Sequence, residues 1–455
     1  MTAPVFDSRA FYRRLWRLTL PIALQSLMLA LVAAADALML GQVTQEQMTA
    51  VSQATQIQFI QNMFIGSISG AGAILGAQYY GRRDMRTIAS LFGLMLRFSG
   101  LVSLAFFGMC EAVPDLLMRL FTSDEELVLI GSDYLRIAGW SYLMTGVSEC
   151  YLSVMKVTDH VPASAVISST AVVLNILLNA IFIFGIAGAP RLEARGAALA
   201  TTLSRAIQLG ICFAVSARRG YLRPTLSGLW RTPMGLGRDF GRQCWPLLGA
   251  SLLWGVGFTS YTAIIGHMGK HAAAANSVAA VVRDLICCVC NGIGSAAAIM
   301  VGNELGAGRL ETGRLYGMKL KNISWVIGIA SMLLVFALTP LTVRMVILSD
   351  EARGYLTGMM LIMGVYMIGR CVNTVTINGV LDGGGDTVFD MYSLVVSMWC
   401  VAIPLAFLGA FRFGWPVLAV YACTCLDEVG KIPWVMIRLR KYKWVQDLTR
   451  TMEQS

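Results

Sequence analysis

The stretch LTLPIALQSLMLALVAAADALML, residues 18–40, contains a single ionisable side chain, that of Asp36. An apolar helix of about 20 residues crosses the roughly 30 Å of hydrocarbon in a bilayer. The core of a secretory signal is shorter, at about 7–15 residues, so we interpret this run as a retained first span. Similar runs along the chain predict spans near residues 18–41, 50–80, 88–112, 128–155, 161–187, 196–217, 246–268, 272–303, 322–347, 355–380, 388–410 and 416–437.

Composition indicates the same class of protein. Of the 455 residues, 56% are hydrophobic and only 14% are charged, and the mean hydropathy is +0.65. Soluble domains carry about 25% charged residues, so a soluble fold is excluded. The eleven cysteines fall almost entirely within apolar segments, where they are expected to be reduced packing residues. The sequence predicts an all-α polytopic membrane protein of about 12 transmembrane helices.

The net charge of +10 is a topology signal rather than a sign of nucleic-acid binding. If the N-terminus is cytoplasmic, the cytoplasmic segments hold about three times as many lysines and arginines as the outer loops, as the positive-inside rule requires. We therefore expect both termini in the cytoplasm and the chain in the inner or plasma membrane, without a nucleic-acid partner.

The two halves of the chain resemble each other at an offset of 225 residues. Pro21, Asp36, Gly41, Ile74 and Gly81 correspond in this way to Pro246, Tyr261, Gly266, Ile299 and Gly306. This repeat predicts an N-terminal six-helix lobe at 1–217, a cytoplasmic loop at 218–245, a C-terminal six-helix lobe at 246–437 and a basic cytoplasmic tail at 438–455. Because six is an even number, the lobes should be pseudo-symmetric about an axis along the membrane normal, around a central cavity.

Asp36 is the clearest candidate for function, because ionisable groups at membrane depth are costly and by default functional. Burial disfavours the charged form of a carboxyl group, so Asp36 could exchange a proton, or bind Na⁺ with other oxygen ligands. Asn175 and Asn179 are four residues apart and share a helix face. They could bond this carboxyl or ligate a cation, or could simply hold two helices together. Thr201 and its neighbour Thr202 are similar but weaker candidates, since threonine often bonds its own helix.

The remaining charged and aromatic residues are less specific. Arg283 with Asp284, and Glu428 with Lys431, are expected to form structural ion pairs, whereas partners for Glu149, Arg205 and Arg370 stay open. Aromatic candidates for a substrate cavity are Phe59, Phe64, Tyr142, Trp254 and Tyr261. The three histidines are dispersed and no catalytic constellation is present, so no metal, cofactor or enzymatic activity is expected.

Several segments together resemble the MATE (multidrug and toxic compound extrusion) transporters over essentially the whole chain. They are the first span with Pro21, Asp36 and Gly41, then GAALAT at 196–201, AAAANSV at 272–278, IMVGNELG at 299–306 and GGGDT at 383–387. The resemblance implies a V-shaped bundle of twelve helices that exports cationic amphiphiles in exchange for H⁺ or Na⁺. It also implies that Asp36 is the coupling acid and Asn175 its neighbour.

The chain departs from this pattern at three places. Many members carry an acid where this chain has Asn179, and many carry another in the seventh span, which reads GASLLW at 249–254. The family's usual arginine before the glycine run is Asp382 here. Coupling is therefore expected to rest on Asp36 alone.

The predicted function is a secondary antiporter that exports small cationic or amphiphilic molecules, such as drugs, by alternating access. Its partners would be these molecules and the lipid bilayer, and it would act as a monomer. The alternative is a flippase of lipid-linked precursors, which would need several basic residues in the N-terminal cavity.

Overall fold

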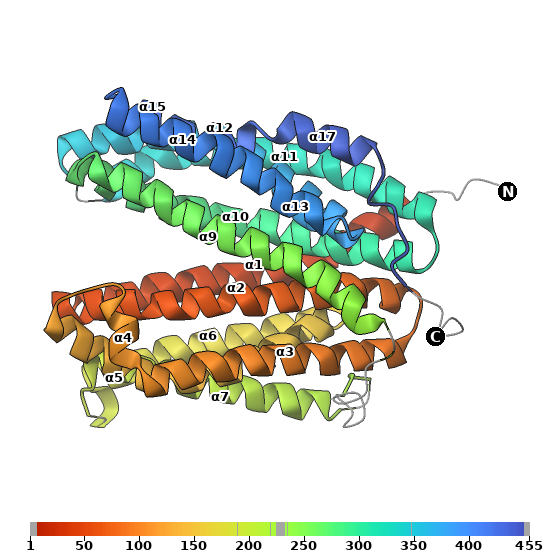
Figure 1. The fold of residues 1–455 in the computed structure, drawn as a ribbon, viewed down its shortest axis with the longest axis horizontal. Coiled ribbons are helices and arrows are strands. Elements are labelled where there is room, and N and C mark those ends of the chain that lie inside the picture. Colours follow the sequence, from red (N-terminus) through yellow and green to blue (C-terminus); the bar gives the residue numbers. More distant parts are fainter. Residues whose placement is uncertain are drawn as a thin grey trace. The chain divides into compact units, whose positions relative to one another are not determined.

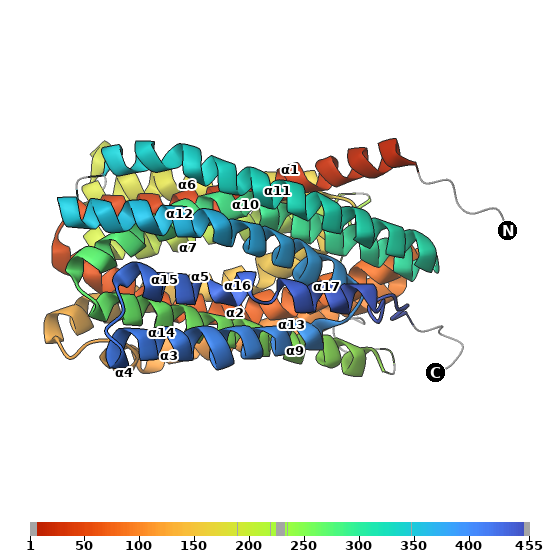
Figure 2. The same cartoon turned by 90° about the horizontal axis from the view of Figure 1, so that it is seen from above.

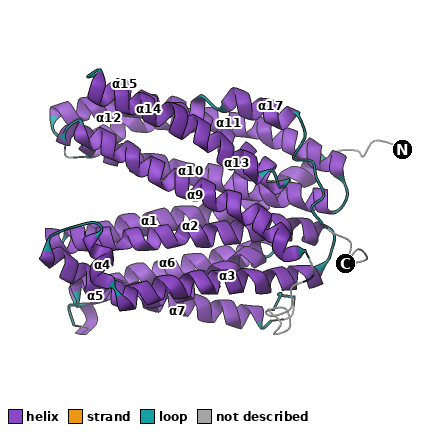
Figure 3. Cartoon of the chain, in the orientation of Figure 1, coloured by secondary structure: helices purple, strands orange, loops and turns teal. Residues whose placement is uncertain are grey.

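The structure is a computed structural model. It describes residues 7–188, 190–218, 220–223, 233, 235–346 and 348–449, without the side chains of residues 33, 34, 36–38, 41 and 187. All regular secondary structure in these ranges is helical, as Figure 3 shows. The chain divides into two compact units, residues 24–244 and residues 1–23 with 245–454. We call them the N-terminal unit and the C-terminal unit.

The N-terminal unit holds most of α1 (Ser8–Gly41) and the start of α9 (Leu236–His267). Between them come α2 (Gln45–Gly81), α3 (Met85–Ala112), α4 (Pro114–Arg119), α5 (Glu125–Val157), α6 (Val161–Phe184), the short η1 (Ile186–Gly188) and α7 (Glu193–Ser216). Helix α5 contacts α2, α3 and α7, and α6 lies against α7 (Figure 1). Thus α5 is at the centre of this unit.

The C-terminal unit contains the rest of α9, then α10 (Lys270–Gly306), α11 (Leu310–Met345) and α12 (Asp350–Asn373), which continues as the π-helix η2 (Thr374–Leu381). The next span is α13 (Thr387–Leu394), η3 (Val395–Ala402), α14 (Ile403–Phe407) and η4 (Leu408–Arg412). The last is α15 (Val417–Thr424), α16 (Leu426–Val429) and α17 (Ile432–Arg440). Figure 2 shows α11 and α12 side by side.

Helix bounds recur at the offset that the sequence predicts. Helices α10, α11 and α12 begin 225 residues after α2, α3 and α5 respectively. Pro21 and Pro246 also lie at equivalent places, inside α1 and α9. The repeat in sequence is therefore also a repeat of helix starts.

Ten helices of the described part are long and apolar enough to cross a membrane. They do not include α5, whose Asp133, Arg136, Glu149 and Lys156 lower its mean hydropathy. Nor do they include the last predicted span, which is interrupted at Cys425 and again at residues 430–431. With these two segments the number is twelve, and the prediction of an all-α polytopic membrane protein is confirmed.

The first residues of α1 belong to the C-terminal unit because they pack closely on α10. A methyl group added at Gly292 would lie 3.0 Å from the Thr19 carbonyl oxygen and 2.9 Å from the Ala23 Cβ. Arg14 Nη1 also lies 3.5 Å from Glu304 Oε1. The structural division thus falls within α1 and inside the 218–245 segment, whereas the lobe boundaries predicted from the sequence keep residues 1–217 together.

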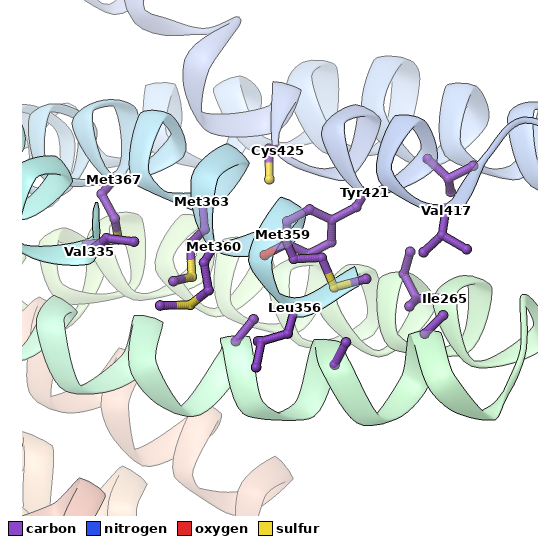
Figure 4. Packing of buried hydrophobic residues seen from close by; sticks show 14 of the residues in the cluster. Ile265, Val335, Leu356, Met359, Met360, Met363, Met367, Val417, Tyr421 and Cys425 are labelled. Carbon is purple, nitrogen blue, oxygen red and sulfur yellow. The ribbon is translucent and has the colours of Figure 1, made fainter. Parts of the chain in front are cut away.

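The core of the C-terminal unit is rich in methionine. Met359, Met360, Met363 and Met367 of α12 are fully buried, and Figure 4 shows them with Val335, Leu356 and Tyr421. Methionine fills irregular gaps because its side chain is unbranched and flexible. This packing holds α12 against α10, α11 and α15.

Candidate functional site

A polar cavity of about 100 Å³ lies within the N-terminal unit. It is lined by residues of five helices: Leu29 and Val32 of α1, Thr55 and Gln58 of α2, Tyr134 of α5, Ala171, Val172 and Asn175 of α6, and Thr201, Ser204 and Arg205 of α7. More than half of these side chains can form hydrogen bonds. Polar side chains buried inside a membrane-spanning bundle are costly unless they are hydrogen-bonded to one another or to a ligand or ion.

Asn175 is the best-connected side chain of this cavity and is only 6% exposed. Its Nδ2 donates to Thr201 Oγ1 at 3.2 Å and to Ser204 Oγ at 3.5 Å, across α6 and α7. Its Oδ1 accepts from Asn179 Nδ2, one turn along α6, at 3.2 Å. The structure therefore brings together three of the four predicted ion-site residues, Asn175, Asn179 and Thr201.

The side chain of the fourth predicted residue, Asp36, is outside the described part of the structure. The backbone around it is helical, within Ser8–Gly41. Two described residues of the same helix, Leu29 and Val32, line the cavity. The α1 helix thus contributes to the cavity one turn before position 36.

Two further polar residues of α7, Arg205 and Thr202, form hydrogen bonds next to this site. Arg205 Nη1 donates to Gln208 Oε1 at 2.8 Å on the same helix. Thr202 Oγ1 bonds the Ala198 carbonyl of its own helix at 2.9 Å and the Ile137 carbonyl of α5 at 3.0 Å. Thr202 therefore joins helices, and it is Thr201 whose hydroxyl reaches the cavity.

The aromatic candidates separate into two groups. Tyr142 is fully buried in the apolar core of the N-terminal unit and is not among the residues that line the polar cavity. Phe64 packs on Phe106, with ring centroids 5.9 Å apart. Trp254 and Tyr261, in contrast, both line a small pocket of about 50 Å³ in the C-terminal unit.

The charged pairs of the C-terminal unit form as predicted. Arg283 Nη2 lies 2.9 Å from Asp284 Oδ1, and Lys431 Nζ lies 3.0 Å from Glu428 Oε2. The partner that the sequence leaves open for Arg370 is also Glu428, at 2.9 Å. Two cations thus share one buried carboxylate.

Sequence reasoning missed two buried carboxyl groups. Asp427 is 5% exposed and lines the same pocket as Trp254 and Tyr261. Asp382, which stands before the glycine run, is buried directly after η2. The sequence does carry a signal for Asp427, because two adjacent acids, Asp427 and Glu428, stand in an otherwise apolar span in which Lys431 can pair with only one of them.

Comparison with known proteins identifies the family. The family model MatE matches residues 21–181 and again residues 246–408, once in each half of the repeat. The chain belongs to the MatE family. The resemblance to MATE transporters is confirmed, and the protein is a multi-pass membrane transporter.

Relatives of this MatE-family transporter align over most of its length. The uncharacterized transporter YisQ of Bacillus subtilis is 22% identical over 457 residues, covering 98% of this chain and 99% of YisQ. The probable multidrug resistance protein NorM of Bradyrhizobium diazoefficiens is 27% identical over 421 residues, covering 89% and 88%. The fold is similar to that of a mutant of the Vibrio cholerae MATE transporter VcmN, with a TM-score of 0.87 at 16% identity over 96% of this chain and 98% of VcmN.

Proposed function

We propose that this transporter is a secondary antiporter that exports small cationic, amphiphilic molecules in exchange for H⁺ or Na⁺ by alternating access. One observation carries the proposal most directly. Asn175 and Thr201, which are hydrogen-bonded to each other, line the same polar cavity as Leu29 and Val32 of α1. Position 36 is four residues after Val32, and residues four apart in a helix share a face. Asp36 is thereby the acid best placed in the sequence to serve this cavity.

The hydrogen bonds around Asn175 support a role in ion exchange. Thr201 Oγ1 accepts a hydrogen bond from Asn175, so its own hydroxyl hydrogen is available to a carboxylate. Asn175 also donates to Ser204 Oγ, and hydroxyl oxygens such as those of Thr201 and Ser204 are suitable ligands for Na⁺. An acid that holds the coupling ion in one state and substrate in the other links the two binding events, and this linkage is reciprocal.

The name of one relative supports the proposed class of substrate. NorM of Bradyrhizobium diazoefficiens is named a probable multidrug resistance protein, and drugs extruded by such proteins belong to the class proposed here. We further propose that the chain acts as a monomer in the inner or plasma membrane, with both termini in the cytoplasm, and that its functional halves are residues 1–217 and 246–437, with 218–245 as the connecting loop.

A flippase of lipid-linked precursors is the competing function. The pyrophosphate of such a lipid carries multiple negative charges and needs several cationic partners. Among the described residues that line the polar cavity, Arg205 alone is basic, and it is hydrogen-bonded to Gln208. The cavity therefore favours the antiporter.

The experiment that tests the function is dye export by the purified protein in proteoliposomes. A cationic dye such as ethidium is supplied, and a pH gradient or a Na⁺ gradient is imposed in separate runs. One gradient should drive dye movement, and an ionophore that collapses that gradient should abolish it. Dye that stays in place under both gradients would contradict the proposed antiport.

A further inference from the structure

We propose that the 50 Å³ pocket of the C-terminal unit binds the ammonium head group of an organic amine, with Asp427 as its counter-ion. This inference rests on the proposed function and deepens it, since it states how a cationic substrate is recognised. A cavity needs roughly 10–15 Å³ to hold one water molecule. A pocket of about 50 Å³ can therefore hold a small head group but not a whole amphiphile.

The pocket lies where the last span is broken. Helix α15 ends at Thr424 and α16 spans only Leu426–Val429, before α17 begins at Ile432. Non-helical backbone at membrane depth is tolerated where it is buried in protein or lines a cavity, and substrate sites of transporters are typically formed by such discontinuous helices. Cys425, at the first break, lines the pocket beside Tyr421 of α15, and both appear in Figure 4.

A close backbone contact holds the broken segment in place. A methyl group added at Gly369 of α12 would lie 2.8 Å from the Glu428 carbonyl oxygen. Asn373 Nδ2 also donates to that carbonyl at 2.7 Å and to Glu428 Oε2 at 2.7 Å. The position of Asp427, next to Glu428, is thus determined by α12.

Asp427 supplies an unused negative charge. Its Oδ1 is buried and makes no hydrogen bond to any described residue, and no described lysine or arginine lies within ion-pair distance of it. Arg370 and Lys431 both bind Glu428 instead, at 2.9 and 3.0 Å. Asp427 is therefore a buried carboxyl group without an ion-pair partner among the described residues. A bound ammonium group would supply the counter-charge that a buried carboxylate needs.

Aromatic rings form the walls around this carboxylate. The lining includes Trp254, Phe258, Tyr261, Tyr366 and Tyr421. The face of an aromatic ring attracts cations, most strongly where water is excluded. Tyr261 lies beside Asp427 in the pocket lining, and its phenolic oxygen can accept a hydrogen bond from an ammonium N–H.

Among the described residues that line the pocket, Arg283 is the one arginine, and its charge is already neutralised. Arg283 Nε and Nη2 both donate to Asp284 Oδ1, at 3.0 and 2.9 Å. Its Cζ lies 4.5 Å from the centroid of the Phe258 ring, which shows that the rings of this pocket accept a cation on their faces. With Arg283 paired to Asp284, the charge left to select a ligand is that of Asp427. A neutral ligand of the same shape would leave this buried carboxylate unpaired, at a cost that favours the cation.

The test is binding to the purified full-length protein in nanodiscs, without any gradient, by isothermal titration calorimetry. The probes are phenethylamine near neutral pH, where it carries an ammonium group, and its neutral isostere 2-phenylethanol. The wild type should bind the ammonium and discriminate against the alcohol. Asp427→Asn, which keeps the side-chain volume, should weaken ammonium binding roughly tenfold to a hundredfold, the value of a charge-assisted hydrogen bond. Asp427→Glu should retain most of the affinity.

The matched control is Asp350→Asn, which removes a fully exposed carboxylate of the same unit and should leave affinity unchanged. If Asp427→Asn does not fold, Trp254→Leu replaces it, with an expected loss of several-fold from the missing ring face. Equal affinity for ammonium and alcohol, or unchanged affinity in the tested pocket variant, would overturn the proposal. A wild type that binds the ammonium but exports no dye would instead contradict the antiport and leave this pocket intact.

Discussion

Asn175 on α6 donates a hydrogen bond of 3.2 Å to the hydroxyl of Thr201 on α7. The two residues are 26 positions apart in the chain, and both line the polar cavity of the N-terminal unit. Because Thr201 Oγ1 accepts in this contact, its own hydroxyl hydrogen is available to another acceptor. It is the local geometry on which the proposed ion exchange depends.

Asn175→Ala should lower the rate of gradient-driven dye export several-fold while export keeps its dependence on the coupling ion. The substitution removes a hydrogen-bonding neighbour of the proposed site but not the coupling acid, so the expected loss is about 1 kcal/mol, that of one net hydrogen bond. Initial rates in proteoliposomes measure the effect. Asn322→Ala, at an exposed position of α11, is the control. A loss of ion dependence in Asn175→Ala would show that this amide itself carries the coupling ion.

Glu428→Gln should lower the free energy of unfolding by about 3–5 kcal/mol, because it removes the carboxylate with which both Arg370 and Lys431 form their ion pairs. Thermal unfolding of the purified protein in detergent measures the change. Glu125→Gln removes a carboxylate from an exposed pair with Arg119, which should cost less than about 1 kcal/mol. Equal shifts in the two variants would show that the buried network contributes no more than a surface pair.

Gly369→Ala should destabilise the protein by about 1–3 kcal/mol, since the new methyl group meets the Glu428 carbonyl oxygen at 2.8 Å and backbone cannot move aside cheaply. The same substitution at Gly354 of α12, which has open space around it, should be neutral or stabilising by roughly 0.5–1 kcal/mol. Thermal unfolding of the pair gives the sign of each change. Stabilisation in both variants would contradict the close approach of α12 to α16.

A reporter that is active only in the cytoplasm should be bright when fused after Ser455 and silent when inserted at Ser349. The expectation follows from the excess of lysine and arginine in the segments assigned to the cytoplasm. Fluorescence normalised to protein amount measures it. The reverse pattern would overturn the topology and, with it, the direction proposed for export.

The sequence predicts the helices better than the contacts between them. The spans predicted at 50–80 and 272–303 from local apolar pattern match α2 and α10, although these helices begin a few residues earlier, at Gln45 and Lys270. The bond between Asn175 and Asn179 follows in the same way from their spacing of four. Contacts across helices do not, because the register between two helices depends on the packing of both.

Glu428 illustrates this limit. Its pairing with Lys431, three residues away, is visible in the sequence, whereas Arg370 is 58 residues distant and reaches it only through the packing of α12 on α16. Because Arg370 and Lys431 both pair with Glu428, Asp427 has no cationic partner of its own among the described residues. The pocket around Asp427 therefore depends on contacts between distant segments, which the sequence alone does not reveal.

Asp36→Asn tests most directly whether export is coupled to an ion through Asp36. The measurement is dye export in proteoliposomes under imposed pH and Na⁺ gradients, with wild type and variant reconstituted to the same density. Asparagine can neither release a proton nor balance a Na⁺, so gradient-driven export should be abolished while the variant remains folded and inserted. Export at the wild-type rate, with an unaltered dependence on pH and Na⁺, would contradict the account and show that this carboxyl group is structural.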